Sequence, residues 1–413
     1  MSRHRRPLAG VAVLAGALLL AAGCGSGFNS GSPTSDQQSG PADLQIMIAS
    51  SGDAETAAVK RAAASWATSS GNKATVIPAQ NIDQQLGQAF AGSKPPDVFY
   101  LDAAKVADYA SVGALWAYGS RLTDADDFYP TLRKAFTYQG TLYCAPKDFS
   151  TLGLEINTAM WSRAGLTDAD IPTTWDQLRT VAQTLKNKGM LPLAVSPTHD
   201  RLDAFLAQAG GQIVNTSGKP VADTPQNLRG LQYVQGLLKD GLLAYSSSLD
   251  TGWGGEAFGK AKAVMTIEGN WIDGAMKSDY PNVQYRIAPL PAGPAGAATL
   301  EFTQCWGISA KSQHHTQALA FVDAMTAVPQ QLAFAKAFGV IPSRQSAQAT
   351  YVKDFPADKA FLAGAPHGVG PVNAPKVDSV LSDYDSQLTQ LATTDPKSIL
   401  QRLQSNLAAA LGS

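Results

Sequence analysis

Residues 257–274, with the sequence AFGKAKAVMTIEGNWIDG, constrain the fold more than any other part of the chain. The apolar run AVMTI is typical of a short buried strand, and it is followed at once by Glu268 and Asn270. Gly269 between them predicts a sharp strand-to-helix turn, because glycine adopts backbone conformations that other residues avoid. Trp271 follows the turn. Since ligands of α/β proteins bind at the carboxyl ends of strands, the sequence predicts a binding site here.

The chemistry of this turn suits a sugar. An indole packs against the apolar face of a sugar ring, while amide and carboxylate groups bond to the hydroxyl groups at its rim. The segment from Phe258 to Trp271 resembles the F-x-x-G-K-A-A-M…G-x-W block of extracellular solute-binding proteins of the carbohydrate ABC-importer type, and it departs from that block at Lys262. On the residues alone, the alternative is that Trp271 only fills the core.

The N-terminal residues predict export and anchoring. Three arginines precede an uncharged apolar run at 8–22, which is too short to span a bilayer comfortably and indicates a secretory signal peptide over residues 1–23. The sequence LAAGC that ends at Cys24 resembles a bacterial lipobox, with Ala at a place where Leu is preferred. This resemblance implies that Cys24 carries acyl chains and anchors the protein outside the cytoplasm, on the cell membrane. The alternative is an ordinary signal peptide with an incidental cysteine.

Composition allows two domains and disfavours one class of partner. The chain has 413 residues, of which 45% are hydrophobic and 16% charged, as in a soluble globular protein with room for two cores. Removal of residues 1–23 takes three of the 32 basic residues and leaves 29 against 33 acidic ones, a net charge of −4. This balance does not favour nucleic acid. Residues 24–42 are rich in Gly, Ser, Pro and Gln and predict a flexible tether.

Two strand ends near the start of the folded part supply candidate ligand contacts. A strand at 44–49 leads through a loop to Asp53 and a helix, which together make one unit of a parallel sheet. The later run KPPDVFYLD resembles the G-x-x-P-D-V block of the same family. It brings Tyr100 and Asp102 to the carboxyl end of a strand, where both are candidates for a cleft.

Two segments resemble the strands that cross between lobes in this family. Residues 138–158 are similar to its y-x-G-k-x-Y-g-l-P…l-x-Y-N block, and the resemblance implies that Asp148 and Phe149 face a ligand just past the crossing. Residues 299–309 match the strand that carries the chain back to the first lobe, with Trp306 on that hinge strand.

Two other positions complete the candidates. Trp253 stands in a glycine-rich loop close to the predicted turn, where an aromatic ring would stack on a sugar. Arg344 follows Pro342 in a Pro-x-Arg turn that approaches the ligand in the family. The loop at 199–201, with the sequence His-Asp-Arg, lies opposite the predicted turn.

The three cysteines indicate one disulfide. With Cys24 lipidated, Cys144 and Cys305 remain as an even pair in an oxidising compartment. Because the two crossing segments lie side by side in the family, the resemblance implies a disulfide between them. A bridge requires α-carbons within about 7 Å, and two buried thiols are the alternative.

The fold class that follows is α/β, with two interleaved lobes joined by hinge strands, as in periplasmic binding proteins of type II. The resemblance implies one lobe from residues 43–144 plus 306–345 and another from 145–305 plus 346–413. It also implies a monomeric receptor that captures a mono- or oligosaccharide by hinge closure and serves the permease subunits of an ABC importer, with no cofactor, metal or catalytic residue. The candidate ligand contacts are Asp53, Tyr100, Asp102, Asp148, Phe149, Trp253, Glu268, Asn270, Trp271, Trp306 and Arg344.

Two other functions share parts of this pattern. A secreted glycoside hydrolase also lines its site with carboxylates and tryptophans, but it holds its acid and its nucleophile at a fixed separation, whereas the acids here come from two lobes that should move. The same fold with a polyamine as ligand would also use the acids.

Overall fold

The computed structural model describes residues 40–50, 52–215 and 217–412. The predicted signal peptide, Cys24 and nearly all of the predicted tether lie outside these ranges. Among the residues that are described, no helix combines the length and the apolar character needed to cross a membrane.

The first sheet is built on three parallel strands whose sequences explain their burial. β1 alternates buried and more exposed residues, whereas the run VFYL in β3 is buried on both faces, as expected for a central strand. The strand order is β13-β6-β12-β3-β1-β2, and β14 pairs with β12. The strands are β1 (Asp43–Ile48), β2 (Lys73–Pro78), β3 (Val98–Asp102), β6 (Ala145–Thr151), β12 (Thr299–Ile308), β13 (Ile341–Pro342) and β14 (Gly368–Val369).

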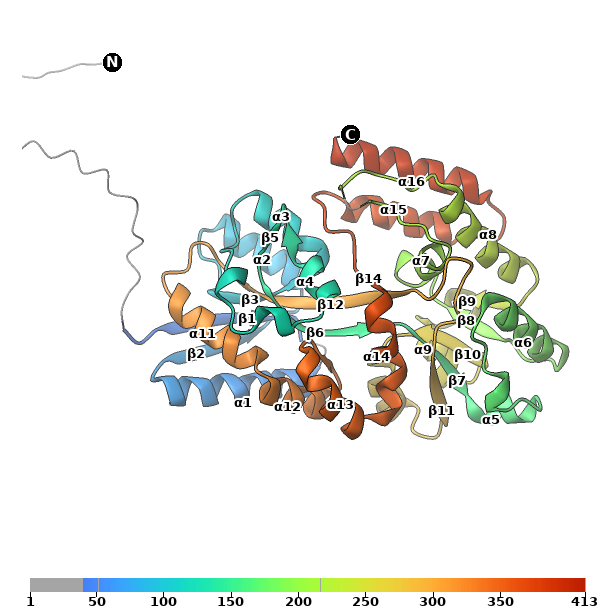
Figure 1. Ribbon diagram of the computed structural model, residues 1–413, viewed down its shortest axis with the longest axis horizontal. Helices are drawn as coiled ribbons and strands as arrows, with labels where there is room; N and C mark the ends of the chain where they lie inside the picture. The colour runs from blue at the N-terminus through green and yellow to red at the C-terminus, as the bar shows by residue number, and fades with distance from the viewer. Residues whose placement is uncertain (1–39, 51, 216, 413) are drawn as a thin grey trace, which may run out of the picture. The chain divides into compact units, whose positions relative to one another are not determined.

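Helices lie on both sides of this sheet (Figure 1). The longest, α1, buries Val59, Ala63 and Trp66 at helical spacing and ends at Gly71 in a left-handed conformation. The helices of this part are α1 (Asp53–Ser70), α2 (Ile82–Ala91), α3 (Val106–Ser111), α4 (Pro130–Ala135), α11 (His315–Thr326) and α12 (Val328–Phe338). The hairpin strands β4 (Thr137–Tyr138) and β5 (Thr141–Leu142) complete it.

The second sheet has the order β11-β7-β10-β8-β9 and its own core. Its strands are β7 (Gly153–Asn157), β8 (Leu193–Val195), β9 (Leu243–Tyr245), β10 (Met265–Glu268) and β11 (Tyr285–Pro289). The helices around it are α5 (Thr158–Arg163), α6 (Trp175–Asn187), α7 (His199–Gln208), α8 (Pro225–Lys239), α9 (Gly254–Gly259), α10 (Trp271–Asp279), α15 (Asp378–Leu388) and α16 (Pro396–Leu411). Two short helices, α13 (Gln348–Asp354) and α14 (Lys359–Gly364), pack on a third buried cluster around Phe149.

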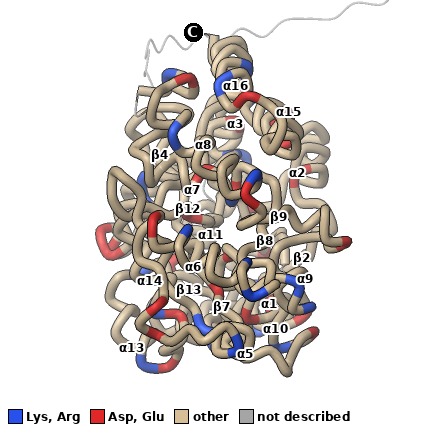
Figure 2. The backbone as a smooth tube through the Cα atoms, turned by 90° about the vertical axis from the view of Figure 1, so that its right-hand side faces the viewer, with Lys and Arg blue, Asp and Glu red and all other residues tan. Residues whose placement is uncertain are grey.

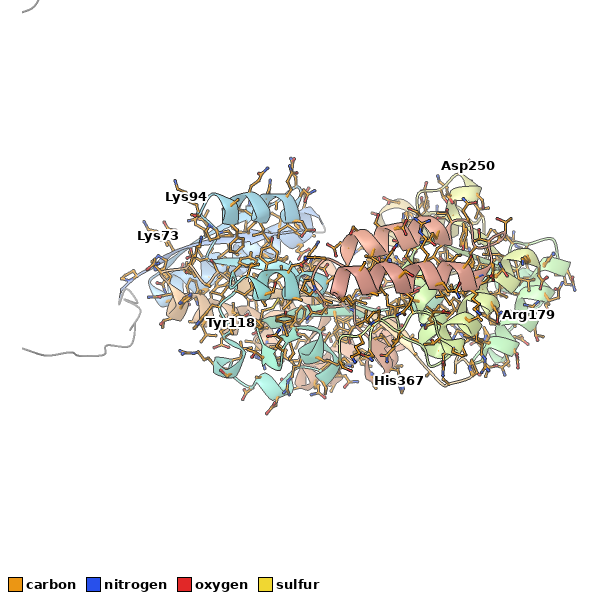
Figure 3. The ribbon with its side chains drawn as sticks, turned by 90° about the horizontal axis from the view of Figure 1, so that it is seen from above. Lys73, Lys94, Tyr118, Arg179, Asp250 and His367 are labelled. Carbon is orange, nitrogen blue, oxygen red and sulfur yellow. A yellow bond between two sulfur atoms is a disulfide. The ribbon has the colours of Figure 1, made fainter. Side chains whose placement is uncertain are left out.

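Two antiparallel strands join the sheets. β6 and β12 run side by side (Figure 1), and β6 passes through Leu152 directly into β7 of the second sheet. Tyr118, labelled in Figure 3, ties the pair together, because its hydroxyl donates to the carbonyl of Trp306 and accepts from the backbone N–H of Ala145 at 2.9 Å. The two separate cores agree with two lobes, while the lobe boundaries given above remain a prediction.

Cys144 and Cys305 form a disulfide at this junction. Their α-carbons are 5.7 Å apart, within the range that a bridge requires. Cys305 lies on β12 opposite Pro146 of β6, and Cys144 directly precedes β6. The bridge therefore fastens the two hinge strands to each other, on the side of the first sheet.

Charged residues do not form a single-sign face at the end of the molecule that carries the second sheet. Figure 2 shows basic and acidic positions interspersed along the helices on that side. This distribution gives no support to a nucleic-acid surface, which requires clustered Lys and Arg.

Candidate binding cleft

A cavity of about 2380 Å³ is lined by residues from both sheets and from the hinge strands. Six of the eleven predicted contacts line it, and they come from the loops after β1, β3 and β10 and from β6. This placement agrees with the rule that α/β proteins bind ligands beyond the carboxyl ends of strands. The six are Asp53, Asp102, Asp148, Phe149, Asn270 and Trp271.

Trp271 is the main apolar surface in this wall. It is the first residue of α10, and 36% of its surface is exposed, which is unusual for a tryptophan. Its ring meets Phe302 of β12 edge to face with centroids 5.0 Å apart. The guanidinium carbon of Arg201, on α7, lies 5.1 Å from the centroid of the indole. The indole is therefore open to the cavity but packed against two elements.

Gly269 permits this position of the indole, although not for the reason that the sequence suggests. Its backbone is not in the left-handed region, so the expected conformational role is wrong. A Cβ at Gly269 would instead collide with the six-membered ring of Trp271 and lie 2.7 Å from Oγ of Ser150. Glycine is required here because other groups come so close.

Glu268 does not line the cavity, which corrects its predicted role as a ligand contact. The side chain is fully buried, and its Oε2 accepts from Nη2 of Arg201 at 2.6 Å and from Nε1 of Trp271 at 3.0 Å. Burial raises the pKa of Glu268, while the neighbouring Arg201 opposes that rise. The carboxylate acts within the protein, one layer behind the cleft surface.

Asn270 is largely buried and also bonded within the protein. Its Nδ2 donates to the carbonyl of Gly339 at 2.5 Å, and its backbone N–H donates to Oγ of Ser150 at 2.9 Å. These bonds join the start of α10 to the end of α12 and to β6. Asn270 therefore connects parts of the cleft wall that belong to different elements.

The cleft floor holds a buried charge cluster that the sequence did not reveal. Nζ of Lys147 pairs with Glu55 at 3.1 Å and also with Asp148, and it lies 4.5 Å from the ring centroid of Tyr100. Burial alone would lower the pKa of Lys147, but the charges of Asp148 and Glu55 outweigh burial and raise it. The ammonium group is held charged, with two carboxylates that line the cavity.

Acidic side chains stand at the carboxyl ends of three parallel strands. Asp53 begins α1 after β1, Asp83 lies in the first turn of α2 after β2, and Asp102 ends β3 and accepts from the backbone N–H of Ala104 at 3.2 Å. Each carboxylate is favourable at a helix start. None of the three forms an ion pair with another residue in the described ranges, so their oxygens other than Oδ1 of Asp102 remain available to hydroxyl or amino groups in the cavity.

Two predicted contacts belong to the core of the first sheet instead. Tyr100 and Trp306 are each 1% exposed and face each other across β3 and β12. Trp306 also packs edge-on against Phe321 of α11 with centroids 5.6 Å apart. Neither side chain lines the cavity, which corrects their predicted contact with a ligand: Trp306 packs against α11, and Tyr100 lies beneath Lys147 of the cleft floor.

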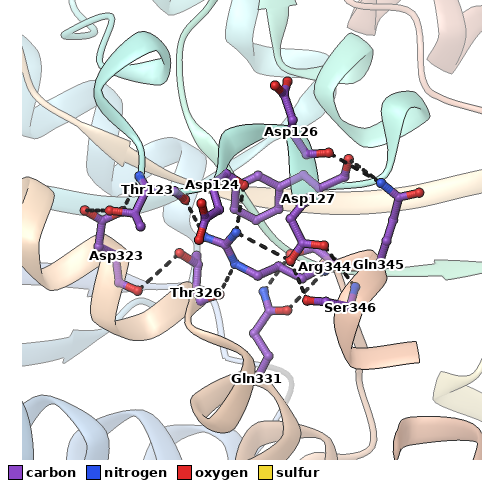
Figure 4. A network of polar contacts seen from close by, with 12 residues as sticks. Thr123, Asp124, Asp126, Asp127, Asp323, Thr326, Gln331, Arg344, Gln345 and Ser346 are labelled. Atoms are coloured by element: carbon purple, nitrogen blue, oxygen red, sulfur yellow. Dashed lines mark hydrogen bonds and ion pairs between the residues drawn. The ribbon is translucent and has the colours of Figure 1, made fainter. Parts of the chain in front are cut away.

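The predicted ligand contact of Arg344 is also wrong. Arg344 is 5% exposed, and its guanidinium donates to the carbonyls of Thr326 at 2.6 Å, Asp124 at 2.9 Å and Thr123 at 3.0 Å. Figure 4 shows this network, in which the arginine joins the loop at 123–127 to the end of α11. Its donors serve backbone carbonyls and the carboxylate of Asp127, which is 3.7 Å from Nη1, and Arg344 does not line the cavity.

Trp253 and Phe149 contribute less to the cleft than predicted. Trp253 is not among the cavity-lining residues. It packs against the cluster of Phe258 and Met276, and its six-membered ring lies close to Gly255. Phe149 touches the cavity but is almost fully buried, with its ring 5.1 Å from that of Tyr129. It lies on the opposite face of β6 from its neighbours Asp148 and Ser150, as strand alternation requires.

Three cleft residues escaped the sequence reasoning. Phe302 sits in a strand read as a plain crossing, and Lys147 and Glu55 are charged residues whose pairing depends on tertiary contact. The predicted loop at 199–201 is wrong, because Arg201 lies on α7 and its guanidinium packs over Trp271. The alternation of β12 was the available signal for Phe302. Among the described residues, no group of His, Cys, Asp and Glu side chains is arranged to hold a metal ion.

The comparisons with known proteins agree with this architecture. Residues 48–332 match the bacterial extracellular solute-binding protein family. The chain belongs to that family. Its members bind a solute and are not enzymes, so the hydrolase alternative is set aside. A cyclic alpha-maltosyl-1,6-maltose binding protein of Arthrobacter globiformis has a similar fold, with a TM-score of 0.80, 21% identity and coverage of 90% of this chain and 99% of that one.

Relatives in sequence are distant. A putative binding protein of Brucella abortus is 23% identical over 234 residues, which are 54% of this chain and 56% of that protein. The chain therefore spans about half the length of the first curated relatives that it matches. The diacetylchitobiose binding protein DasA of Streptomyces coelicolor is 23% identical over 346 residues, covering 79% of this chain and 76% of that protein.

Proposed function

We propose that this protein captures a mono- or oligosaccharide in the cleft between its lobes and delivers it to the permease subunits of an ABC importer. The observation that carries the proposal is the half-exposed indole of Trp271 in a cavity whose other walls present carboxylates. An indole face with acceptors around it matches a sugar ring better than it matches a wholly apolar or a wholly ionic solute. Similarity to proteins named for binding diacetylchitobiose and a cyclic maltosyl-maltose supports the same class.

Hinge closure supplies the mechanism. A ligand that contacts Asp53 or Asp102 on one lobe and Trp271 on the other favours the closed form by its greater affinity for that form. The crossing strands β6 and β12 carry the motion. Anchoring through lipidated Cys24, which lies outside the described residues, would keep the monomeric receptor near its importer.

A polyamine is the second candidate. Asp53, Asp83 and Asp102 are unpaired within the described ranges and face the cavity, and they would attract ammonium groups. A polyamine could place an ammonium group over the indole of Trp271, but it has no ring face and no hydroxyl groups to match the polar groups around that indole.

A thermal-shift panel separates the two. Mono- and oligosaccharides and spermidine are added to the protein, and a ligand present at 100 times its dissociation constant stabilises by about 2.7 kcal/mol. The proposal expects shifts with at least one saccharide, and Trp271→Ala should reduce the stabilisation by about half or more at the same ligand concentration, as a tenfold or greater loss of affinity requires. If no sugar changes the melting temperature and spermidine raises it, the polyamine becomes the preferred ligand and the sugar proposal is rejected.

A further inference from the structure

The indole of Trp271 is exposed but is held on several sides. Its Nε1 donates to Glu268 at 3.0 Å, its ring meets that of Phe302, and its six-membered ring closely approaches Gly269. A surface tryptophan without such contacts samples several rotamers. This one has a fixed orientation before any ligand arrives.

Glu268 is the centre of these contacts. One of its two carboxylate oxygens, Oε2, accepts three hydrogen bonds. The donors are Nε1 of Trp271, Nη2 of Arg201 and, at 3.1 Å, Nε of Arg201. Arg201 is in turn placed over two rings, 5.1 Å from the centroid of Trp271 and 5.7 Å from that of Phe302. One buried carboxylate therefore fixes both the indole and the cation that covers it.

We propose that Glu268 is a positioning residue for ligand binding, which acts through Trp271 and Arg201 and does not touch the ligand. The inference rests on the proposed function for its ligand but on the geometry above for its mechanism. Glu268 is fully buried, and it lies behind residues that line the cavity.

The arrangement also restricts how a ligand stacks. Arg201 lies over the indole and is itself only 13% exposed, so a ring must pack on the part of Trp271 that the guanidinium leaves open. Preorganisation of this surface removes the cost of ordering a tryptophan on binding. Affinity for a ring-shaped saccharide should therefore depend on Glu268 even without a direct contact.

The test uses Glu268→Ala and Glu268→Gln with two readouts. Protein labelled with 5-fluorotryptophan gives a resonance for Trp271, assigned by its absence in Trp271→Phe, and calorimetry gives the dissociation constant for the saccharide found in the panel. In the ligand-free protein, Glu268→Ala should shift or broaden the Trp271 resonance and weaken binding at least tenfold. Glu268→Gln keeps a carbonyl acceptor for the indole N–H and should retain most of both properties.

The matched control is Arg179→Gln. Arg179 pairs with Asp240 on the same lobe, in an exposed ion pair outside the cavity lining. The Arg179→Gln variant should change neither the Trp271 resonance nor the affinity for the saccharide. If Glu268→Ala does not fold, the double variant Glu268→Leu with Arg201→Met removes the acceptor of the indole N–H together with both charges, and loss of that acceptor should still shift the resonance.

Three outcomes are distinguishable. An unmoved Trp271 resonance in Glu268→Ala, or in the double variant that replaces it, overturns the proposal. Equal losses of affinity in Glu268→Ala and Glu268→Gln, again with an unmoved resonance, would show direct contact with the ligand instead. A wild-type protein that binds no saccharide would defeat the proposed function, while the resonance of the ligand-free variants would still decide the role of Glu268.

Discussion

The rings of Trp306 and Tyr100 meet edge to face, with centroids 4.7 Å apart, because the two residues are paired across strands β12 and β3. Neither reaches the cavity. Trp306 instead fastens the hinge strand β12 to the core of the first sheet, where Phe321 covers its other side. Of the three tryptophans in the predicted site, Trp306 is thus a core residue and Trp271 a cleft residue, so substitution of the first should lower stability and substitution of the second should weaken binding.

Trp306→Ala should destabilise the fold by about 3–5 kcal/mol, since it leaves a large cavity in a packed core. Trp271→Ala should change the stability by less than about 1 kcal/mol and weaken saccharide binding about tenfold or more, because the side chain is partly exposed and lines the cleft. Urea denaturation and calorimetry measure the two effects. Loss of binding in Trp306→Ala at full stability would reverse the assignment.

The sequence predicted the placement of elements better than the direction of side chains. Strand ends such as Asp102 and the turn before Trp271 reached the cavity as expected, because a strand's carboxyl end follows from its chain direction. Whether a residue on a buried strand faces the cleft or the helices depends on register and on the covering helices. That information is absent from a strand such as β3, which is apolar on both faces, and so Tyr100 was misplaced.

Ion pairs between residues that are distant in sequence are the second feature that the sequence does not predict. Lys147, Glu55 and Arg201 acquire their roles through partners that are far away in sequence, with Lys147 and Glu55 separated by 92 positions. Composition and spacing carry no record of such pairs. The prediction for Arg344 fails for the same reason, since the sequence around an arginine does not indicate that backbone carbonyls will occupy its donors.

Arg344→Gln should destabilise the protein without a direct effect on binding. The substitution leaves the carbonyls of Thr123, Asp124 and Thr326 short of donors in a buried region, and we expect a loss of about 2–4 kcal/mol. Thermal denaturation gives the stability, and the saccharide dissociation constant measured well below the melting temperature should stay within about twofold. Arg179→Gln, which breaks an exposed pair, serves as the control and should cost less than about 1 kcal/mol.

The disulfide between Cys144 and Cys305 should form in the purified protein and should stabilise it. The cysteines are 161 positions apart, so the bridge closes a long loop in the unfolded chain, and its loss should cost about 2–5 kcal/mol. A thiol assay under denaturing, non-reducing conditions on a chain that begins at Gln37 should find no reactive thiol, and two after reduction. Two reactive thiols before reduction would contradict the bridge. Cys144→Ser with Cys305→Ser gives the stability difference.

Lys147 should be essential to the cleft floor. Lys147→Met leaves Glu55 and Asp148 buried together without a cation, which should cost about 3–5 kcal/mol at neutral pH. The triple variant with Glu55→Gln and Asp148→Asn removes the repulsion and should recover most of that loss in urea denaturation. A single variant as stable as the wild type would show that the ammonium group is not needed.

Glu301 on the hinge strand β12 should make the stability depend on pH. Its carboxyl is buried, Oε2 accepts from Thr131 at 2.6 Å, and Oε1 has no hydrogen-bond partner among the described residues. Burial raises its pKa from 4.5 to about 7, against the smaller opposing effect of the bond from Thr131. A raised carboxyl pKa means that the native state holds the proton more tightly than the unfolded state does. The stabilisation from this proton is therefore present below the unfolded value of 4.5 and is lost as the pH rises through 7.

The measurement is urea denaturation of Glu301→Gln and wild type at pH 5 and pH 8. Glutamine cannot ionise and keeps an acceptor for Thr131, so the variant should be more stable than wild type at pH 8 by about 1–3 kcal/mol and nearly equal to it at pH 5. Other buried carboxyls, such as that of Asp203 with a pKa of about 7, titrate in both proteins, and their contribution cancels in the difference. A stability difference that is the same at the two pH values would show that Glu301 does not titrate in this range. A variant less stable than wild type at pH 8 would show that the ionised carboxylate has a stabilising partner.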